Sequence, residues 1–257
     1  MMYQVLIAGP DGCYPGMAID ENAETAAFFS SERAECFGSM NPEDVKRCDG
    51  MVIPGGLPDV NPVYWGEQNT ACHVVDAEMD RRQMAMIERA IALRKPMFGI
   101  CRGMQLVVVR YGGSLIQDIA SGESHRYEEG NARFHSVRNT LGTFMSELYG
   151  ESVVVNSGHH QAVKKLPGNF RVSQLWCPDE AELERNAALA AAGKLHEGTD
   201  RCIIEAVYQT DYPFVGLQWH PELRGELFCK HLDLSKIRSY FYRMMEENRN
   251  RANKIQQ

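Results

Sequence analysis

The sequence predicts an α/β protein whose central sheet is mostly parallel and flanked by helices. Short apolar segments that suit buried strands alternate with longer segments whose apolar residues recur at helical spacing. The strand expected at residues 97–100, for example, lies between predicted helices at residues 76–93 and 102–111. Since ligands of such sheets bind beyond the carboxyl ends of the strands, the chemistry is expected in the segments that follow them.

The other expected elements run along the whole chain. Asn41 caps a helix start, because a proline and two acids follow it at the first turn. A helix over residues 179–192 is expected to end at Gly193, and a long polar helix is expected from about Gly225 to the end, fraying over residues 248–257. The remaining predicted strands cover residues 4–8, 49–53, 152–156, 170–176, 202–208 and 214–218.

Composition favours one domain over residues 1–257. The chain is 44% apolar, and neither a linker-like stretch nor a repeat divides it. Its net charge of -7 and its scattered basic residues argue against a nucleic-acid partner. No leader-like segment is evident and no apolar run approaches the ~20 residues of a membrane helix, so we expect a cytoplasmic protein without membrane contact. The oligomeric state stays open, a homo-oligomer included.

Cysteine usage is typical of a reducing compartment. The eight cysteines are scattered and form no CxxC pair. No set of cysteines and histidines has zinc-finger spacing, so we expect no metal, although a site assembled from distant residues stays open. The seven cysteines other than Cys101 are expected to be packing or surface thiols.

Cys101 stands between two glycines at a predicted strand-to-helix junction, Gly99-Ile100-Cys101-Arg102-Gly103. This pattern matches the sharp elbow that displays a nucleophile. The glycines permit the tight turn and let a substrate approach closely, and the helix N-terminus favours a thiolate. Cys101 is therefore the predicted nucleophile, and the alternative is a small buried cysteine that only packs.

A base and its orienting acceptor follow the last predicted strand, in Trp219-His220-Pro221-Glu222. Positions two apart in an extended chain point to the same side, so Glu222 can hold one ring nitrogen of His220 while the other faces the thiol. Alternatively, the histidine caps a strand end and the glutamate is a solvated loop carboxylate. The backbone N–H groups of Gly56 and Arg102 are the predicted donors to an oxyanion.

These segments resemble class I glutamine amidotransferase domains. The resemblance rests on residues 54–56 (PGG), 99–105 (GICRGMQ) and 218–222 (QWHPE). Within that superfamily, residues 59–67 (DVNPVYWGE) and 155–161 (VNSGHHQ) are similar to segments of gamma-glutamyl-gamma-aminobutyrate hydrolases. The resemblance spans about residues 50–222. It implies a three-layer, flavodoxin-like fold and a Cys101–His220–Glu222 triad that hydrolyses a gamma-glutamyl amide through a thioester.

The resemblance also implies substrate-side residues. Gln105 lies one helical turn past the cysteine, and the candidates beside it are Asn61, Tyr64 and His160. Each has a plainer interpretation: Gln105 as a helix-surface amide, the histidine as a structural hydrogen-bonding group, and the other two as ordinary loop residues.

The chain also departs from the family pattern. Leu57 is an extra residue after the glycine turn, and Trp65 stands where tyrosine is usual. Gln83 replaces a usual acid beside the retained Asp80, and residues 179–199 resemble an insertion. These changes bear on substrate identity, and the leaving amine stays open.

We therefore expect a cysteine-dependent hydrolase of a small gamma-glutamyl amine that needs no metal or organic cofactor. The alternative is a glutaminase subunit that passes ammonia to a synthetase. That partner would be a separate chain, because no GxxxxGK[ST] phosphate loop is present here. A third hypothesis is a non-catalytic binding protein on the same fold.

Overall fold

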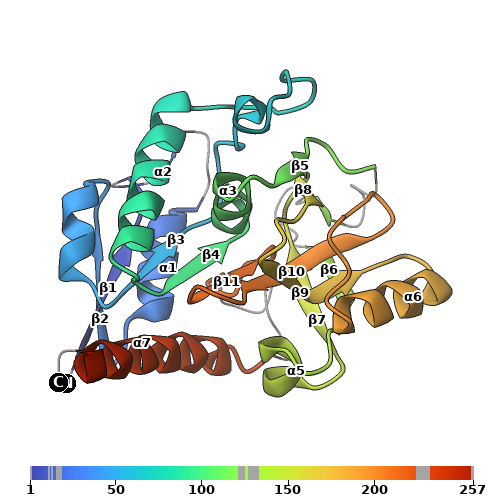
Figure 1. The fold of residues 1–257 in the computed structure, drawn as a ribbon. Coiled ribbons are helices and arrows are strands. Elements are labelled where there is room, and N and C mark those ends of the chain that lie inside the picture. The colour runs from blue at the N-terminus through green and yellow to red at the C-terminus, as the bar shows by residue number, and fades with distance from the viewer. Residues whose placement is uncertain are drawn as a thin grey trace.

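Nine strands form one central sheet in the computed structural model of the chain (Figure 1). The structure describes residues 2–10, 12, 14–15, 19–120, 125–126, 133–223 and 232–255. The strands of this sheet are β1 (Tyr3–Ile7), β2 (Ala34–Gly38), β3 (Gly50–Ile53), β4 (Met97–Ile100), β6 (Arg133–Asn139), β7 (Ser152–Ser157), β9 (Phe170–Trp176), β10 (Ile203–Gln209) and β11 (Phe214–Leu217). A second sheet pairs β5 (Ser114–Ile116) with β8 (Ala162–Lys165).

The central sheet has a parallel half and an antiparallel half. Its strand order is β2-β1-β3-β4-β11-β10-β9-β6-β7. The first five strands in this order run parallel, and each of the next four runs antiparallel to the strand before it. The last strand of the sequence therefore lies in the middle of the sheet, where the two halves meet.

Helices cover both faces of the sheet and make three layers (Figure 1). One face packs against α2 (Ala77–Ala92) and α3 (Arg102–Arg110), and the other against α1 (Glu21–Phe29) and α7 (Ser235–Ile255). Alternate residues of each inner strand serve the two cores, as the pleat requires. The remaining helices are α5 (Phe144–Tyr149), α6 (Glu180–Ala191) and the short 3₁₀ segments η1 (Pro42–Arg47) and η2 (Pro62–Trp65).

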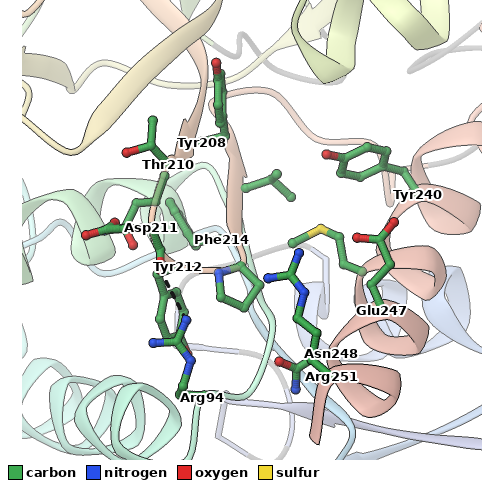
Figure 2. A pocket seen from close by; sticks show the side chains of 14 residues that line it. Arg94, Tyr208, Thr210, Asp211, Tyr212, Phe214, Tyr240, Glu247, Asn248 and Arg251 are labelled. Carbon is green, nitrogen blue, oxygen red and sulfur yellow. Dashed lines mark hydrogen bonds between the residues drawn. The ribbon is translucent and has the colours of Figure 1, made fainter. Parts of the chain in front are cut away.

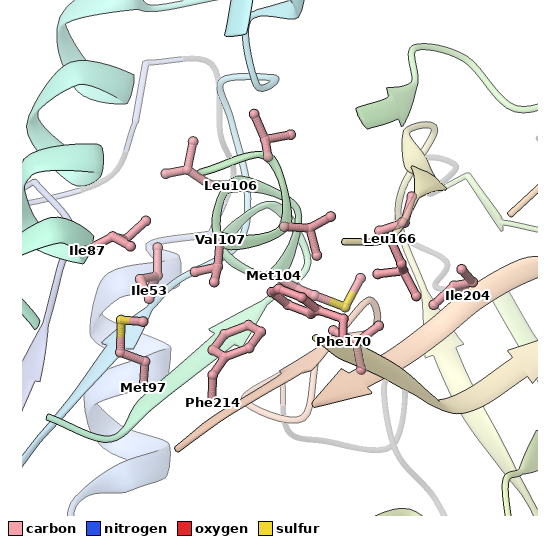
Figure 3. Close-up of a cluster of buried hydrophobic side chains, with 14 of the residues drawn as sticks. Ile53, Ile87, Met97, Met104, Leu106, Val107, Leu166, Phe170, Ile204 and Phe214 are labelled. Atoms are coloured by element: carbon pink, nitrogen blue, oxygen red, sulfur yellow. The ribbon is translucent and has the colours of Figure 1, made fainter. Parts of the chain in front are cut away.

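Helix α3 is packed tightly onto the sheet. Figure 3 shows Met104 and Val107 of this helix among side chains of β3, β4 and β11, and both are fully buried. Each such side chain contributes roughly 1.5–3 kcal/mol by leaving water. A Cβ built on Gly103 would lie 2.0 Å from the carbonyl oxygen of Ile53, and one on Gly99 would lie 2.7 Å from the backbone nitrogen of Met104. Both glycines are thus required for backbone contact between helix and sheet, and neither has a positive φ.

Most predicted elements are confirmed, several to within one residue. The strands at residues 97–100 and 170–176 agree fully, and the helices at residues 76–93 and 179–192 differ by a residue at each end. Helices α1 and α5 and strands β2, β5, β6 and β8 were not predicted.

The C-terminal helix departs from the prediction. It begins at Ser235, after a non-helical segment at residues 232–234, and Gly225 lies outside the described residues. Helix α7 extends to Ile255, through most of the segment for which fraying is predicted, and the fraying stays a prediction. Arg249 pairs with Asp49 at 2.9 Å and stacks over Tyr3, and these contacts anchor the polar end of the helix.

No helix in the described part of the chain combines the length and apolar character that crossing a membrane requires.

Gly103→Ala tests the contact between α3 and β3. The added Cβ meets backbone atoms that cannot rotate away, so we expect the free energy of unfolding in urea to fall by at least about 2 kcal/mol. Gly168→Ala is the matched control, because a Cβ there meets nothing within 4 Å and the φ is not positive. Its effect should stay within about 0.5 kcal/mol. Equal losses in the two variants would contradict this account of the contact.

Candidate active site

Cys101 occupies a strained turn between β4 and α3. Its φ of 46° and ψ of −109° are rare for a residue with a side chain and cost roughly 1–3 kcal/mol. The Cys101 N–H donates to the carbonyl oxygen of Leu217 at 2.7 Å, so the turn is fastened to the neighbouring strand β11. The elbow geometry predicted from the two glycines is therefore present.

His220 and Glu222 lie beside this turn because β11 runs parallel to β4. Leu217 pairs with Ile100, so the segment after β11 passes the elbow. His220 Nδ1 lies 2.7 Å from Glu222 Oε1, and the imidazole also hydrogen-bonds the Cys101 thiol. The histidine is 5% exposed and the glutamate is fully buried. The structure thus brings the three predicted triad residues together.

The electrostatics of the site favour a charged imidazole. Burial opposes the charge, but the Glu222 carboxylate and the Cys101 thiol outweigh it and hold the pKa of His220 well above its usual value. An imidazolium that is paired on both sides can later donate a proton to a leaving group.

Asn156 holds the backbone of His220 in place. Its Nδ2 donates to the carbonyl oxygen of His220 at 2.7 Å, and its Oδ1 accepts the N–H of His220 at 2.9 Å. Asn156 belongs to the VNSGHHQ segment, and no role was predicted for it from the sequence. The likeness of that segment to the hydrolases was the available signal.

The Gly55-Gly56 turn lies against the triad. A Cβ on Gly55 would lie 2.7 Å from His220 Cε1 and 3.1 Å from Cys101 Cβ, so only glycine leaves room here. Gly56 follows with a φ of +87°. Arg102 is the first residue of α3, where backbone N–H groups have no partner within the helix. Both predicted oxyanion donors therefore flank the nucleophile, and their role stays a prediction.

Glu21 is a site residue that the sequence analysis missed. A Cβ on Gly56 would lie 1.4 Å from Glu21 Oε2, so this carboxyl group packs directly on the glycine turn. Burial is the main cause that raises the pKa of Glu21 to about 7, and the charge of His220 partly opposes it. Glu21 opens α1, and no motif in its sequence marks it.

A chain of amide side chains supports the cysteine from the other side. Gln218 Nε2 donates to Cys101 Sγ at 3.4 Å, while its Oε1 accepts from Gln105 Nε2 at 3.0 Å. The same nitrogen of Gln105 also donates to the carbonyl oxygen of Gln161. Gln105 is buried rather than a helix-surface amide, and its contact with substrate stays a prediction.

The Arg102 side chain turns away from the nucleophile and is buried. It pairs with Asp80 and donates a hydrogen bond to Gln83 Oε1, so the retained acid and its glutamine neighbour both bind it. Asp80 Oδ2 also accepts the backbone N–H of Asn61 at 3.1 Å. The Asn61 side chain caps η2 by accepting from Val63 N, and Tyr64 in that segment is 38% exposed.

The two segments that resemble the hydrolases contact each other. His160 Nε2 lies 2.9 Å from Asp59 Oδ1, and the N–H of Val60 donates to Gln161 Oε1 at 3.3 Å. Burial opposes a charge on His160, but the hydrogen bond to Asp59 and the charge of that carboxylate raise its pKa overall. His73 stacks on His160, and donor atoms of these two histidines and Asp59 lie close enough to hold a cation.

A cavity of about 220 Å³ lies beside the N-terminal end of β11 (Figure 2), whereas the triad segment follows the other end of that strand. It is lined at the β10–β11 turn and along α7, by Tyr208, Tyr212, Tyr240 and Arg251 among others. No triad residue contributes to it, so this cavity is separate from the candidate active site. Six of the eight cysteines are described and carry free thiols, while Cys13 and Cys229 lie outside the described residues.

The sheet order, the cysteine elbow and the buried histidine–carboxylate pair together define a class I glutamine amidotransferase-like fold. Among solved structures, a glutamine amidotransferase from Thermotoga maritima matches with a TM-score of 0.56 at 13% identity, over 96% of this chain and 85% of that one. The glutaminase domain of Trypanosoma brucei CTPS matches with a TM-score of 0.56 at 16% identity, over 96% and 94%. At these low identities, the likenesses show a shared fold and nothing more.

The chain belongs to the peptidase C26 family, whose model matches residues 38–182. The gamma-glutamyl-gamma-aminobutyrate hydrolase PuuD of Escherichia coli K12 is 31% identical over an alignment of 196 residues that covers 72% of this chain and 68% of that protein. The corresponding hydrolase of Escherichia coli O157:H7 is 32% identical over the same shares. Family membership makes this chain a cysteine-type amide hydrolase.

Glu222→Gln tests the electrostatic coupling within the triad. Removing the charge that sustains the imidazolium should lower the pKa of His220 by at least about one unit. An NMR titration of the imidazole measures this pKa, and His220→Gln assigns the signal. Glu180→Gln changes an exposed carboxylate elsewhere and should leave the titration unmoved. An unchanged pKa in Glu222→Gln would contradict the coupling.

Glu21→Gln tests the buried carboxyl at the glycine turn. Because the pKa of Glu21 is raised on folding from 4.5 to about 7, the folded state binds more protons over that interval. The stability that this carboxyl contributes is complete below its unfolded pKa and is lost as the pH rises through about 7. Urea unfolding measures the free energy of unfolding at each pH. Between about pH 5 and about pH 8, this free energy should rise by roughly 1–3 kcal/mol in the variant relative to the wild type.

Glu24→Gln, which removes another carboxylate of α1, is the control for this comparison. A constant difference between Glu21→Gln and wild type across the pH range would count against a raised pKa at position 21.

Proposed function

We propose that this protein hydrolyses the gamma-glutamyl amide bond of a small gamma-glutamyl amine, with Cys101 as the nucleophile. The observation that best supports this proposal is the geometry around Cys101. This residue lies in a strained turn, its thiol is hydrogen-bonded to the His220 imidazole, and the buried Glu222 carboxylate holds that imidazole. Relatives named gamma-glutamyl-gamma-aminobutyrate hydrolase support the substrate class.

The first half-reaction forms a thioester. In this proposal the Cys101 thiol gives its proton to His220, and the resulting thiolate sulfur donates an electron pair to the side-chain carbonyl carbon of the glutamyl group while the C=O π pair moves onto oxygen. The backbone N–H groups of Gly56 and Arg102 stabilise this oxyanion. When the carbonyl re-forms, the C–N bond breaks and the His220 imidazolium gives its proton to the departing amine.

The second half-reaction releases glutamate. His220 is now neutral and takes a proton from water as the water oxygen attacks the thioester carbon. Collapse of the second oxyanion expels the Cys101 sulfur, and the imidazolium–thiolate pair is restored. Glu222 keeps Nδ1 protonated throughout. Nε2 therefore gives up its proton in the first half-reaction and takes up a proton in the second.

The proposed substrate contacts come from the loop at residues 59–67 and from two residues outside it. In this proposal Gln105, Asn61, Tyr64 and His160 bind the glutamyl group or the amine. The contact between His160 and Asp59 anchors this ring, and the Asp59 carboxylate raises the pKa of His160 and so favours its charged form. A carboxylate of the substrate is the complementary group.

A panel of gamma-glutamyl amides tests the proposal. The wild type should hydrolyse substituted gamma-glutamyl amines, with gamma-glutamyl-gamma-aminobutyrate and polyamine conjugates in the panel. Cys101→Ala and His220→Gln should lose roughly 10⁴-fold or more in kcat/KM while remaining folded by circular dichroism. Cys36→Ala, which removes a half-buried thiol from β2, should retain wild-type rates.

Glutamine in the same panel separates the alternatives. Turnover of glutamine alone would favour the glutaminase subunit with a synthetase partner. Full activity of folded Cys101→Ala would overturn the cysteine mechanism, and no turnover of any amide would favour a binding protein.

A further inference from the structure

Two buried cysteines lie side by side at the base of the segment that carries α6. Cys177 follows the last residue of β9, and Cys202 precedes the first residue of β10. They are 8% and 3% exposed, and both carry free thiols. Both belong to the core on one face of the sheet, whereas Cys101 belongs to the core on the other face. Between them lie residues 179–199, the segment that departs from the family pattern.

The register of β9 and β10 places the two cysteines opposite each other. These strands are antiparallel, and Ile203 is paired with Trp176 at the end of their ladder. The next residues outward on the two strands are Cys202 and Cys177. The N–H of Cys202 donates to the carbonyl oxygen of Thr199 at 3.0 Å, and its own carbonyl oxygen accepts the N–H of Thr199 at 2.9 Å. Both backbone polar groups of Cys202 are therefore turned away from β9.

A cross-strand pair of this type has the spacing that a disulfide needs. In an antiparallel sheet, opposite residues whose backbone groups point away from each other have Cα atoms about 4.5 Å apart. Disulfide-bonded cysteines usually have Cα atoms about 4.4–6.8 Å apart. The thiols of Cys177 and Cys202 also hydrogen-bond each other, so the two sulfur atoms already face one another. An S–S bond can therefore form with little movement of the backbone.

The surroundings give the two thiols different roles. The hydrogen bond from Cys202 is the main cause that lowers the pKa of Cys177, and Nδ2 of Asn186 also donates to the Cys177 sulfur at 3.8 Å. The same thiol–thiol hydrogen bond, together with burial, raises the pKa of Cys202. Because the thiolate is the attacking form of a cysteine, Cys177 is the nucleophile of the pair and Cys202 is the thiol that completes the bond.

We propose that Cys177 and Cys202 form a site of reversible oxidation, which a peroxide converts from a dithiol to a disulfide. The Cys177 thiolate attacks one peroxide oxygen, the O–O bond breaks, and the departing oxygen takes up the proton that Cys177 released. Cys177 is then a sulfenic acid. The Cys202 sulfur attacks the Cys177 sulfur, the S–O bond breaks, and the departing hydroxide leaves as water with the Cys202 proton. The pair loses two electrons, and the peroxide gains them.

The disulfide would restrain the segment that carries α6. Ala190 is the buried residue of this helix, and the ion pairs of Arg138 with Glu180 and Glu184 lie near the surface. A bond between Cys177 and Cys202 closes the loop at its base, which reduces the conformations open to the segment when it detaches from the sheet. Oxidation should therefore slow tryptic cleavage within residues 179–199 of the folded chain. The proposal is independent of the proposed hydrolase activity.

Peptide mapping of the full chain tests the site. The measurements use the Cys101→Ala background, so that the predicted nucleophile does not consume the oxidant. The chain is treated with hydrogen peroxide, its free thiols are alkylated in denaturant, and it is digested with trypsin. Trypsin cleaves after Arg185 and Arg201, which separates the two cysteines, so the oxidised chain should give one disulfide-linked pair of peptides. Dithiothreitol added before alkylation should abolish this linked pair.

Variants in the same background separate the two roles. Cys202→Ser should leave Cys177 as a sulfenic acid that dimedone labels, whereas Cys177→Ser should leave Cys202 unlabelled. Cys36→Ser, which removes a half-buried thiol of β2, is the matched control and should keep the linked peptides. If a variant does not fold, the peptide map of the parent chain decides alone.

Three outcomes would count against the proposal. The site would be overturned if both thiols stayed open to alkylation after peroxide treatment, or if Cys177 were linked to a cysteine other than Cys202. Dimedone labelling of Cys202 in Cys177→Ser would overturn the choice of nucleophile.

Discussion

The close contact between helix α3 and strand β3 is the constraint on which the active site depends. Gly103 lies directly against the carbonyl of Ile53, so the helix must start immediately after β4. No residue is left between strand and helix to relax the turn except Cys101, which therefore takes a φ of 46°. The same contact brings the end of β3 to the elbow, and the glycines after Ile53 meet the cysteine. Elbow and glycine turn are two results of one packing arrangement.

The place of β11 in the sheet determines where the predicted base, His220, lies. As the last strand in sequence it inserts beside β4, and its parallel register carries the following segment past Cys101. On its other side the antiparallel half begins. That half provides the support for His220, because Asn156 at the end of β7 fixes its backbone through two hydrogen bonds. The parallel half thus presents the predicted nucleophile, and the antiparallel half holds the backbone of the predicted base.

The parts of the site that sequence predicts are those whose chemistry is local along the chain. The nucleophile is marked by its flanking glycines, and the base and its carboxylate are two residues apart. Glu21 has no such signal, since its position depends on how α1 packs beside the glycine turn. The juxtaposition of Cys177 and Cys202 has no local signal either, because it depends on the register between β9 and β10.

Whether a strand could be predicted depended on how apolar its buried residues are. Strands β4 and β9 are mostly apolar and buried, so composition alone marks them. Strand β6 reads RFHSVRN, with His135 and Asn139 facing inward while Phe134 is exposed. Polar residues of this strand are buried and an apolar residue is exposed. The alternation of apolar and polar residues that identifies a strand is therefore hidden. The antiparallel half is harder to predict because its inward positions serve hydrogen bonding and charge as well as packing.

Anchoring of the loop at residues 59–67 limits which side chains can select a substrate. Asp59 is occupied by His160 and by the backbone N–H of His73, and the Asn61 side chain caps η2. Trp65 packs partly against the core. Val63 and Tyr64 remain at 64% and 38% exposed, on a loop whose backbone is fixed to Asp80 and thereby to Arg102 beside the nucleophile. A rigid backbone with exposed apolar and aromatic side chains is suited to discriminate the amine portion of the substrate proposed above, because the glutamyl portion is common to every gamma-glutamyl amine.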